Sequence, residues 1–150
     1  MKISKRLLDE LVDAYEDNDP MHQYFLNVKT GEVEFLTDYE PDEELSDRIE
    51  EGFGEIYFRV PRISSSEGYD VMEEFAETVA SSKIRHRLYE ALNRSKKVFR
   101  RFKDVLDDYP EERDRYYKFL RKYCEEQIIE WLKEEEIEIT LKSIDTGQPK

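Results

Sequence analysis

The segment HQYFLNVKTGEVEFL, residues 22–36, decides the fold. Two short runs of strand-forming residues, 22–28 and 32–36, stand on either side of Lys29-Thr30-Gly31. Valine, phenylalanine and tyrosine favour strands, and glycine adopts the positive φ that a tight turn needs. The segment therefore predicts a β-hairpin, and the neighbouring elements are predicted outward from it.

A helix is predicted before the hairpin. Ser4 is a residue type that caps helices, and Asn18-Asp19-Pro20 ends the helix because proline cannot continue it. Between these ends, apolar side chains recur at spacings of three and four. They are Leu7, Leu8, Leu11, Val12 and Tyr15.

A second helix and a third strand are predicted after the hairpin. Pro41, followed by three acidic residues, suits a helix N-terminus, where the helix dipole favours negative charge. This helix runs through Leu45 and Ile49 to Gly52. Residues Glu55–Pro61 predict a strand that proline ends.

The C-terminal half is predicted to be helical. Ser64–Gly68 is a short run of small and polar residues, and it is predicted to be a loop. Helical periodicity returns at Tyr69, and a long helix is predicted over residues 111–134. Alternating apolar residues in 137–141 predict a short strand that extends the sheet. The apolar stripe of the long helix comprises Tyr116, Leu120, Tyr123, Cys124, Gln127, Ile128 and Trp131.

Together these elements predict a single α+β domain over residues 1–150. A small antiparallel β-sheet from the N-terminal half, about residues 20–62, is expected to pack against a C-terminal helical bundle, about residues 67–135. A flexible tail is expected over about residues 144–150. Aromatic residues make up 13% of the chain, so Tyr, Phe and Trp131 are expected to fill the core.

Composition limits the class of protein. The chain has 150 residues, of which 41% are charged and 38% hydrophobic, and its net charge is −13. No apolar run is long enough to span a bilayer, and no signal-peptide stretch opens the sequence. We therefore expect a cytoplasmic protein with no membrane partner. The single cysteine, Cys124, excludes an internal disulfide framework.

The charge is unevenly distributed along the chain. Residues 1–80 are strongly acidic, whereas residues 81–103 hold nine Lys and Arg side chains and one acid, Glu90. Either the basic block is solvated or neutralised by the acidic half, or it is a binding surface. We call its seven candidate binding residues the basic strip: Lys83, Arg87, Arg94, Lys97, Arg100, Arg101 and Lys103.

No catalytic or metal-binding motif is found. His22 and His86 lie far apart, and neither has a second ligand at a recognised spacing, so both are interpreted as structural. Cys124 lies on an apolar stripe, which is typical of a buried thiol. The glycines form no phosphate-binding loop, and the abundant carboxylates single out no catalytic pair. We therefore expect no enzymatic activity, no metal and no cofactor.

Several segments together resemble one bacterial family. They are the hairpin segment Tyr24–Val33, the strand segment Ile56–Pro61, and Leu88–Leu92 leading into Phe99–Leu106. In order and spacing they are similar to the uncharacterised protein family UPF0158. Family members carry a glycine-containing turn before the Phe-x-x-Phe-Lys helix, where this chain has Asn93-Arg94-Ser95-Lys96. The resemblance implies a cytoplasmic bacterial α+β protein and no particular reaction.

The leading functional hypothesis is a non-enzymatic protein-binding or adaptor domain. Either the acidic segment Asp38–Glu51 or the basic strip would contact the partner, with opposite charges steering association. The alternative is RNA or single-stranded nucleic-acid binding through residues 83–103, which requires the cations to converge on one exposed face. An enzyme whose cleft joins distant carboxylates and arginines is the third hypothesis.

Overall fold

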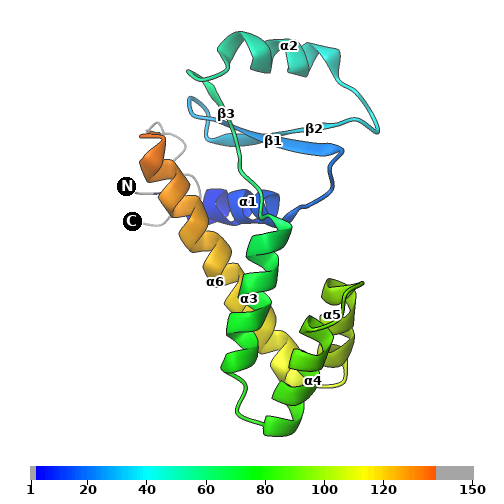
Figure 1. Cartoon of the computed structure of the whole chain (residues 1–150). Helices are drawn as coiled ribbons and strands as arrows, with labels where there is room; N and C mark the ends of the chain where they lie inside the picture. Colours follow the sequence, from blue (N-terminus) through cyan, green and yellow to red (C-terminus); the bar gives the residue numbers. More distant parts are fainter. Residues whose placement is uncertain (1–2, 138–150) are drawn as a thin grey trace. The chain divides into compact units, whose positions relative to one another are not determined.

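The computed structural model describes residues 3–137, and the chain forms two compact units (Figure 1). Unit 1 comprises the described residues up to Ile63 together with those from Cys124 onward, and unit 2 comprises Ser64–Tyr123. The elements are helices and one small antiparallel sheet, so the predicted α+β class is confirmed. No helix in the described part of the chain is both long and apolar enough to cross a membrane.

Unit 1 begins with helix α1 (Lys5–Glu16), which starts where the capping residue predicts. The Ser4 hydroxyl accepts a hydrogen bond from the Leu7 backbone N–H at 3.1 Å, which satisfies one of the free amides of the first turn. Four of the five predicted apolar side chains are buried, and Leu8 is half-buried. The buried residues of the helix are Leu7, Leu11, Val12, Ala14 and Tyr15.

The predicted hairpin is confirmed. Strand β1 (His22–Asn27) pairs antiparallel with β2 (Glu32–Thr37). In the turn, Gly31 has a φ of 75°, and the Asn27 side chain accepts hydrogen bonds from the backbone N–H groups of residues 29 and 30. Strand β3 (Tyr57–Arg59) is shorter than predicted and pairs with the other edge of β1, which gives the order β2-β1-β3.

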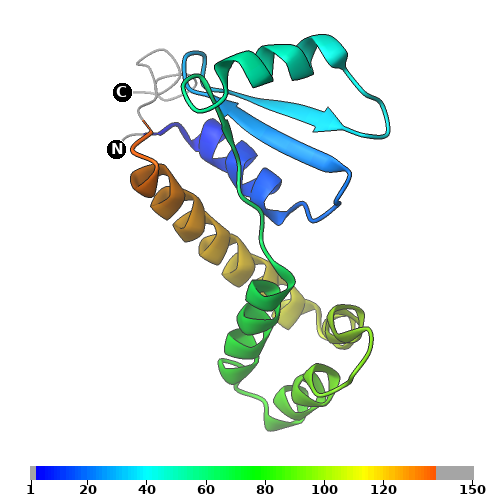
Figure 2. The same ribbon diagram turned by 45° about the horizontal axis from the view of Figure 1, so that its top comes forward.

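Helices α1 and α2 lie on opposite faces of the sheet (Figures 1 and 2). Helix α2 (Glu43–Gly52) starts after Asp42, whose carboxylate accepts a hydrogen bond from the Leu45 N–H at 3.1 Å. A small buried cluster forms between α2 and the sheet. Its members are Phe25, Leu45, Ile49 and Tyr57.

The long predicted helix is confirmed as α6 (Pro110–Glu134), and its C-terminal part belongs to unit 1. There Cys124, Ile128 and Leu132 are fully buried, whereas Trp131 is half-buried. The expectation that Trp131 fills the core is therefore only partly met, since Leu132 takes the inward position. Residues 138–141 of the predicted strand and the predicted tail lie outside the described residues.

Unit 2 contains α3 (Ser65–Glu77), α4 (Ser82–Leu92), α5 (Val98–Asp107) and the first part of α6. The loop predicted over residues 64–68 is wrong, because α3 starts at residue 65. The Ser64 hydroxyl accepts a hydrogen bond from the Glu67 N–H, and the Glu67 carboxylate accepts one from the Ser64 N–H. This reciprocal capping box explains why a polar segment begins a helix.

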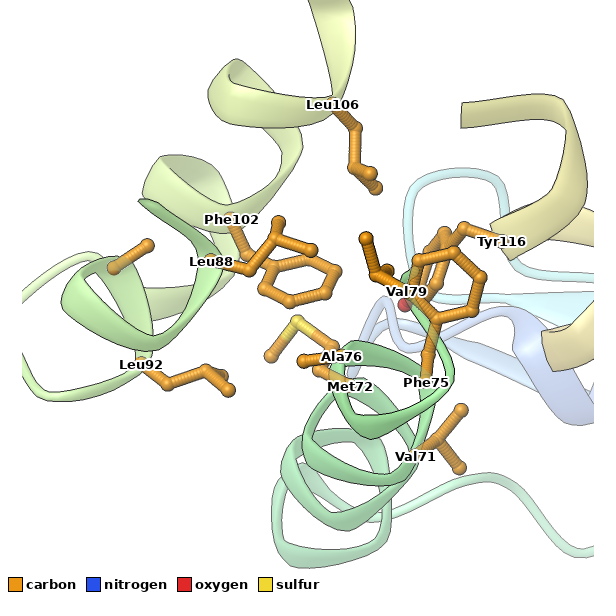
Figure 3. Close-up of a cluster of buried hydrophobic side chains, with 11 residues drawn as sticks. Val71, Met72, Phe75, Ala76, Val79, Leu88, Leu92, Phe102, Leu106 and Tyr116 are labelled. Atoms are coloured by element: carbon orange, nitrogen blue, oxygen red, sulfur yellow. The ribbon is translucent and has the colours of Figure 1, made fainter. Parts of the chain in front are cut away.

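The core of unit 2 is built where the four helices meet (Figure 3). Its aromatic centre joins Phe75, Phe102 and Tyr116, whose ring centroids lie 5.3 Å (75 to 116) and 5.4 Å (102 to 116) apart. Such tilted and edge-on contacts stabilise a core beyond the burial of apolar area. The other buried members are Val71, Met72, Ala76, Val79, Leu88, Ala91, Leu92 and Leu106.

Candidate functional site

Helices α4 and α5 and the turn between them carry the basic strip. Ser81 caps α4 by accepting a hydrogen bond from the Ile84 N–H at 3.3 Å. Leu88 and Leu92 of α4 and Phe102 of α5 point into the core of unit 2 (Figure 3). Because one face of each helix is committed to this core, the charged residues between the apolar positions face outward.

Six of the seven basic-strip residues are exposed, and Arg87 is half-buried. None of the six exposed cations forms an ion pair with an acidic side chain that the structure describes. Their charges are therefore not compensated at contact distance within residues 3–137. These six residues are Lys83, Arg94, Lys97, Arg100, Arg101 and Lys103.

Arg87 differs from the rest of the basic strip because its guanidinium contacts other side chains, whereas the Arg101 guanidinium donates to the Lys96 backbone carbonyl at 3.2 Å. Arg87 donates to the Tyr109 hydroxyl at 2.9 Å and to an Asp108 carboxylate oxygen at 3.0 Å. Its Cζ also lies 5.4 Å from the centroid of the Tyr109 ring. The hydrogen bonds to Tyr109 and Asp108 raise the pKa of Arg87. Arg87 therefore links α4 to the α5–α6 connection as well as facing solvent.

A groove of about 240 Å³ runs between α4 and α5, and we call it the α4–α5 groove. It brings together three members of the basic strip, Arg87, Arg94 and Arg101. The groove is not purely basic, because carboxylates from both helices line it as well. The remaining lining residues are Glu90, Ala91, Asp104 and Val105.

The other cations do not line this groove. Successive residues of a helix are rotated by about 100°, so Arg101 and Lys103 point about 160° apart around the axis of α5. By the same geometry Arg100 lies about 60° from Lys103, so these two share the outer face of the helix. Three cations of the basic strip thus line the groove, whereas Arg100 and Lys103 lie on the outer face of α5, so the condition of a single basic face is met only in part.

The turn before α5 ends in a residue with left-handed backbone conformation. Lys97 has φ 58° and ψ 37°, the left-handed conformation, and its carbonyl accepts the first helical hydrogen bond, from Arg101. A residue with a Cβ atom is disfavoured there, whereas glycine is not. Lys97 therefore holds a backbone conformation that is unfavourable for a lysine, and it adds a positive charge at the start of α5.

Unit 1 contains a polar cluster that the sequence did not reveal, and we call it the Asp17 cluster. The Asp17 carboxylate accepts a hydrogen bond from the Tyr24 hydroxyl at 2.5 Å and lies 2.7 Å from His22 Nδ1. His22 Nε2 lies 3.6 Å from the Asp19 carboxylate, and Arg62 donates to the backbone carbonyls of residues 19 and 22. The cluster ties the loop before β1 to the segment after β3.

These contacts shift the pKa values of Asp17 and Tyr24. Burial alone would raise the pKa of Asp17, but the hydrogen bonds from Tyr24, the Asp19 N–H and His22 outweigh burial and lower it. Burial and the hydrogen bond to Asp17 raise the pKa of Tyr24 to about 12. The carboxylate is therefore held in its charged form, which suits a structural acceptor more than a proton donor.

One sequence signal could have identified the Asp17 cluster. His22 and Tyr24 are two residues apart on a strand, so their side chains share one face. The aspartates before them form successive turns, in which Asp17 accepts from the Asp19 N–H and Asp19 accepts from the Met21 N–H. No group of three or more His, Cys, Asp or Glu side chains within residues 3–137 is arranged to hold a metal ion.

Comparison with known proteins identifies the family of this chain. The model of the uncharacterised protein family UPF0158 matches residues 1–148. A bacterial relative, UPF0158 protein PA5073 of Pseudomonas aeruginosa (strain PAO1), is 28% identical over 140 residues, which cover 93% of this chain and 89% of the relative. No solved structure matches. Since the family match extends over nearly the whole sequence, the chain belongs to the uncharacterised protein family UPF0158.

Proposed function

We propose that this chain is a cytoplasmic protein-binding domain without enzymatic activity. In this proposal the α4–α5 groove binds a segment of a partner protein that presents carboxylate side chains. One observation carries the proposal: Arg94 and Arg101 converge on the groove without an ion pair to a described acid. Arginine is well suited to this role, because its planar guanidinium binds a carboxylate through two hydrogen bonds.

The mixed charge of the groove favours a protein over a nucleic acid. Glu90 and Asp104 lie among the three arginines, and a phosphate backbone would bring its negative charges against both carboxylates. A polypeptide can place acids beside the arginines and donors beside the carboxylates. The strongly acidic residues 1–80 also repel nucleic acid at long range.

Site-specific photo-cross-linking in living cells tests the proposal. A benzophenone amino acid placed at Asp104, inside the groove, is expected to trap a discrete protein adduct, whereas the same group at Lys103 is not. The adduct should disappear with Arg94→Glu/Arg101→Glu and persist with Arg100→Glu, because only the first variant changes the groove. Adducts of equal yield in the Arg94→Glu/Arg101→Glu variant and in the Arg100→Glu variant would contradict a role for the groove.

Nucleic-acid binding is the second candidate, and the six exposed cations without ion pairs to described acids favour it. Fluorescence anisotropy with labelled single- and double-stranded RNA and DNA, across a salt series, separates the two functions. Phosphate binding depends on the total positive charge, so Arg100→Glu/Lys103→Glu should weaken it as much as Arg94→Glu/Arg101→Glu. No binding at low salt would remove this candidate, and salt-sensitive binding that both variants abolish would replace the protein-binding proposal.

A further inference from the structure

Unit 1 has a second and larger groove, of about 500 Å³, between the sheet and α2, and we call it the α2 groove. Its floor is apolar. Phe25 and Ile49 lie at its base and are almost fully buried. The Phe53 side chain is 57% exposed, with its ring centroid 6.4 Å from that of Phe25. An exposed aromatic ring beside a buried one offers apolar surface that a ligand could cover.

The rim of the α2 groove is acidic. Its carboxylates are Asp38, Asp42, Glu43 and Glu50, and none of them forms an ion pair within the described part of the chain. The single cation of the rim, Arg59, is already engaged. It donates to the Gln23 side chain at 2.8 Å and lies 5.5 Å from the centroid of the Phe25 ring. The charge of the rim therefore favours an occupant that carries positive charge around an apolar group.

The groove lies next to a sheet edge. In the order β2-β1-β3, β2 is an outer strand, and within residues 3–137 its outer edge pairs with no strand. Leu36 and Asp38 lie at or beside the end of β2 and line the groove, on the side of the sheet that α2 covers (Figure 2). Residues two apart on a strand share a face, so an added strand would direct alternate side chains toward this rim.

We infer that the α2 groove binds an extended basic segment of another protein, which pairs with the outer edge of β2. The inference rests on the proposed protein-binding function and adds a second site of opposite charge. An apolar side chain of the segment packs beside Leu36, at the β2 side of the groove, and lysines or arginines two residues before and after it, on the same face of the strand, meet the carboxylates of the rim. Main-chain hydrogen bonds to β2 supply affinity that does not depend on sequence.

The first test uses two fluorescein-labelled peptides, Thr-Lys-Thr-Phe-Thr-Lys-Thr and Thr-Glu-Thr-Phe-Thr-Glu-Thr, with the full chain, because this spacing puts the phenylalanine and the charged residues on one face of a strand. Only the basic peptide is expected to bind. Glu43→Lys/Glu50→Lys should weaken its binding at least tenfold. Glu44→Lys/Glu51→Lys is the matched control, because it makes the same charge change on the same helix outside the groove lining. Equal weakening by both variants would overturn the inference in favour of long-range attraction.

The second test concerns strand addition. Methylation of alternate backbone nitrogens removes the N–H donors from one edge of the peptide. One of the two alternating methylation patterns is expected to abolish binding and the other to retain it, since only one edge pairs with β2. If both methylated peptides bind as well as the parent peptide, the occupant is not a strand. If spermidine displaces the peptide at equal concentration, the site binds small cations instead.

The outcomes for the two grooves remain distinguishable. Arg94→Glu/Arg101→Glu should leave peptide binding unchanged, because these residues do not line the α2 groove. If the wild-type chain does not bind the basic peptide but still forms the cross-linked adduct at Asp104, the inference about the α2 groove is overturned and the proposed function of the α4–α5 groove is not. Analytical ultracentrifugation of the unliganded chain tests whether a second copy of the chain occupies the groove. Self-association that Glu43→Lys/Glu50→Lys abolishes would assign the groove to a second copy and would overturn the inference.

Discussion

The Asp17 cluster of unit 1 and the basic strip of unit 2 use charge in opposite ways. In the Asp17 cluster one carboxylate receives a tyrosine hydroxyl, a histidine nitrogen and a backbone N–H. In the basic strip, six exposed cations form no ion pair with a described acid. Charges that are satisfied within the fold support its stability, whereas uncompensated surface charges contribute little to it and are available to a partner.

The largest predicted effect breaks the Asp17 cluster. Asp17→Asn removes the negative charge that accepts these hydrogen bonds, and hydrogen bonds to charged groups each contribute about 1.5–3 kcal/mol. We expect a loss in the free energy of unfolding of that order at neutral pH. Urea unfolding followed by Trp131 fluorescence measures it, because this single tryptophan lies in unit 1.

The pH dependence of the same variant checks the cause. The folded-state pKa of Asp17 lies below the unfolded value of 3.8, so its contribution is fully present above that value and is lost as the pH falls through the folded pKa. The difference between wild type and Asp17→Asn should therefore shrink as the pH falls below about 4. Asp47→Asn, on the exposed face of α2, is the control and should change stability by less than about 0.5 kcal/mol.

The second prediction compares a neutral capping residue, Ser64, with the surface cations of unit 2 in its effect on the free energy of unfolding. Ser64→Ala removes the hydroxyl of the capping box that starts α3. Loss of such a cap costs about 1 kcal/mol. Urea unfolding followed by circular dichroism at 222 nm measures the loss. Ser65→Ala is the control, since residue 65 lies inside the helix. An equal effect of both changes would contradict the capping role.

The sequence predicted the elements whose signals are local. Ser4, the turn at Gly31 and the spacing of apolar residues in α1 and α6 act within one or two turns of chain, and each was found where predicted. The loop predicted at residues 64–68 shows how composition misleads, because small polar residues suggested a loop. The pairing of Ser64 with Glu67, three residues later, is a stronger helix signal than composition.

The sites were predicted less well, because they depend on which helix faces meet. All seven basic-strip residues were selected by charge, yet only Arg87, Arg94 and Arg101 share a groove. Arg62 joins the Asp17 cluster, by donating to the carbonyls of residues 19 and 22, only because β1 pairs with β3, a strand far from it in sequence. Contacts of this range follow from tertiary structure, and the sequence carries no local signal for them.

The third prediction asks whether Lys97 affects the stability of unit 2 through its backbone conformation or through its charge. Lys97→Gly should stabilise unit 2 by about 0.5–1 kcal/mol, because glycine relieves the left-handed conformation at the cost of some unfolded-state entropy. Lys96→Gly removes the same charge where φ is not positive, so it should give no gain. Circular dichroism in urea measures both. A gain from both variants would mean that relief of charge repulsion, and not backbone strain, is the cause.

The smallest predicted effect concerns the α4–α5 groove itself. Arg94→Glu/Arg101→Glu reverses two charges that the described fold does not pair, so we expect a change of less than about 0.5 kcal/mol per substitution in the free energy of unfolding. Thermal and urea unfolding of the double variant measure it beside Arg100→Glu/Lys103→Glu. A loss well above that of the outer-face variant would show that the groove arginines support the fold. A negligible loss of stability, combined with loss of the cross-link at Asp104, would show that these arginines act in partner binding. Their charges would then be required for binding and not for folding.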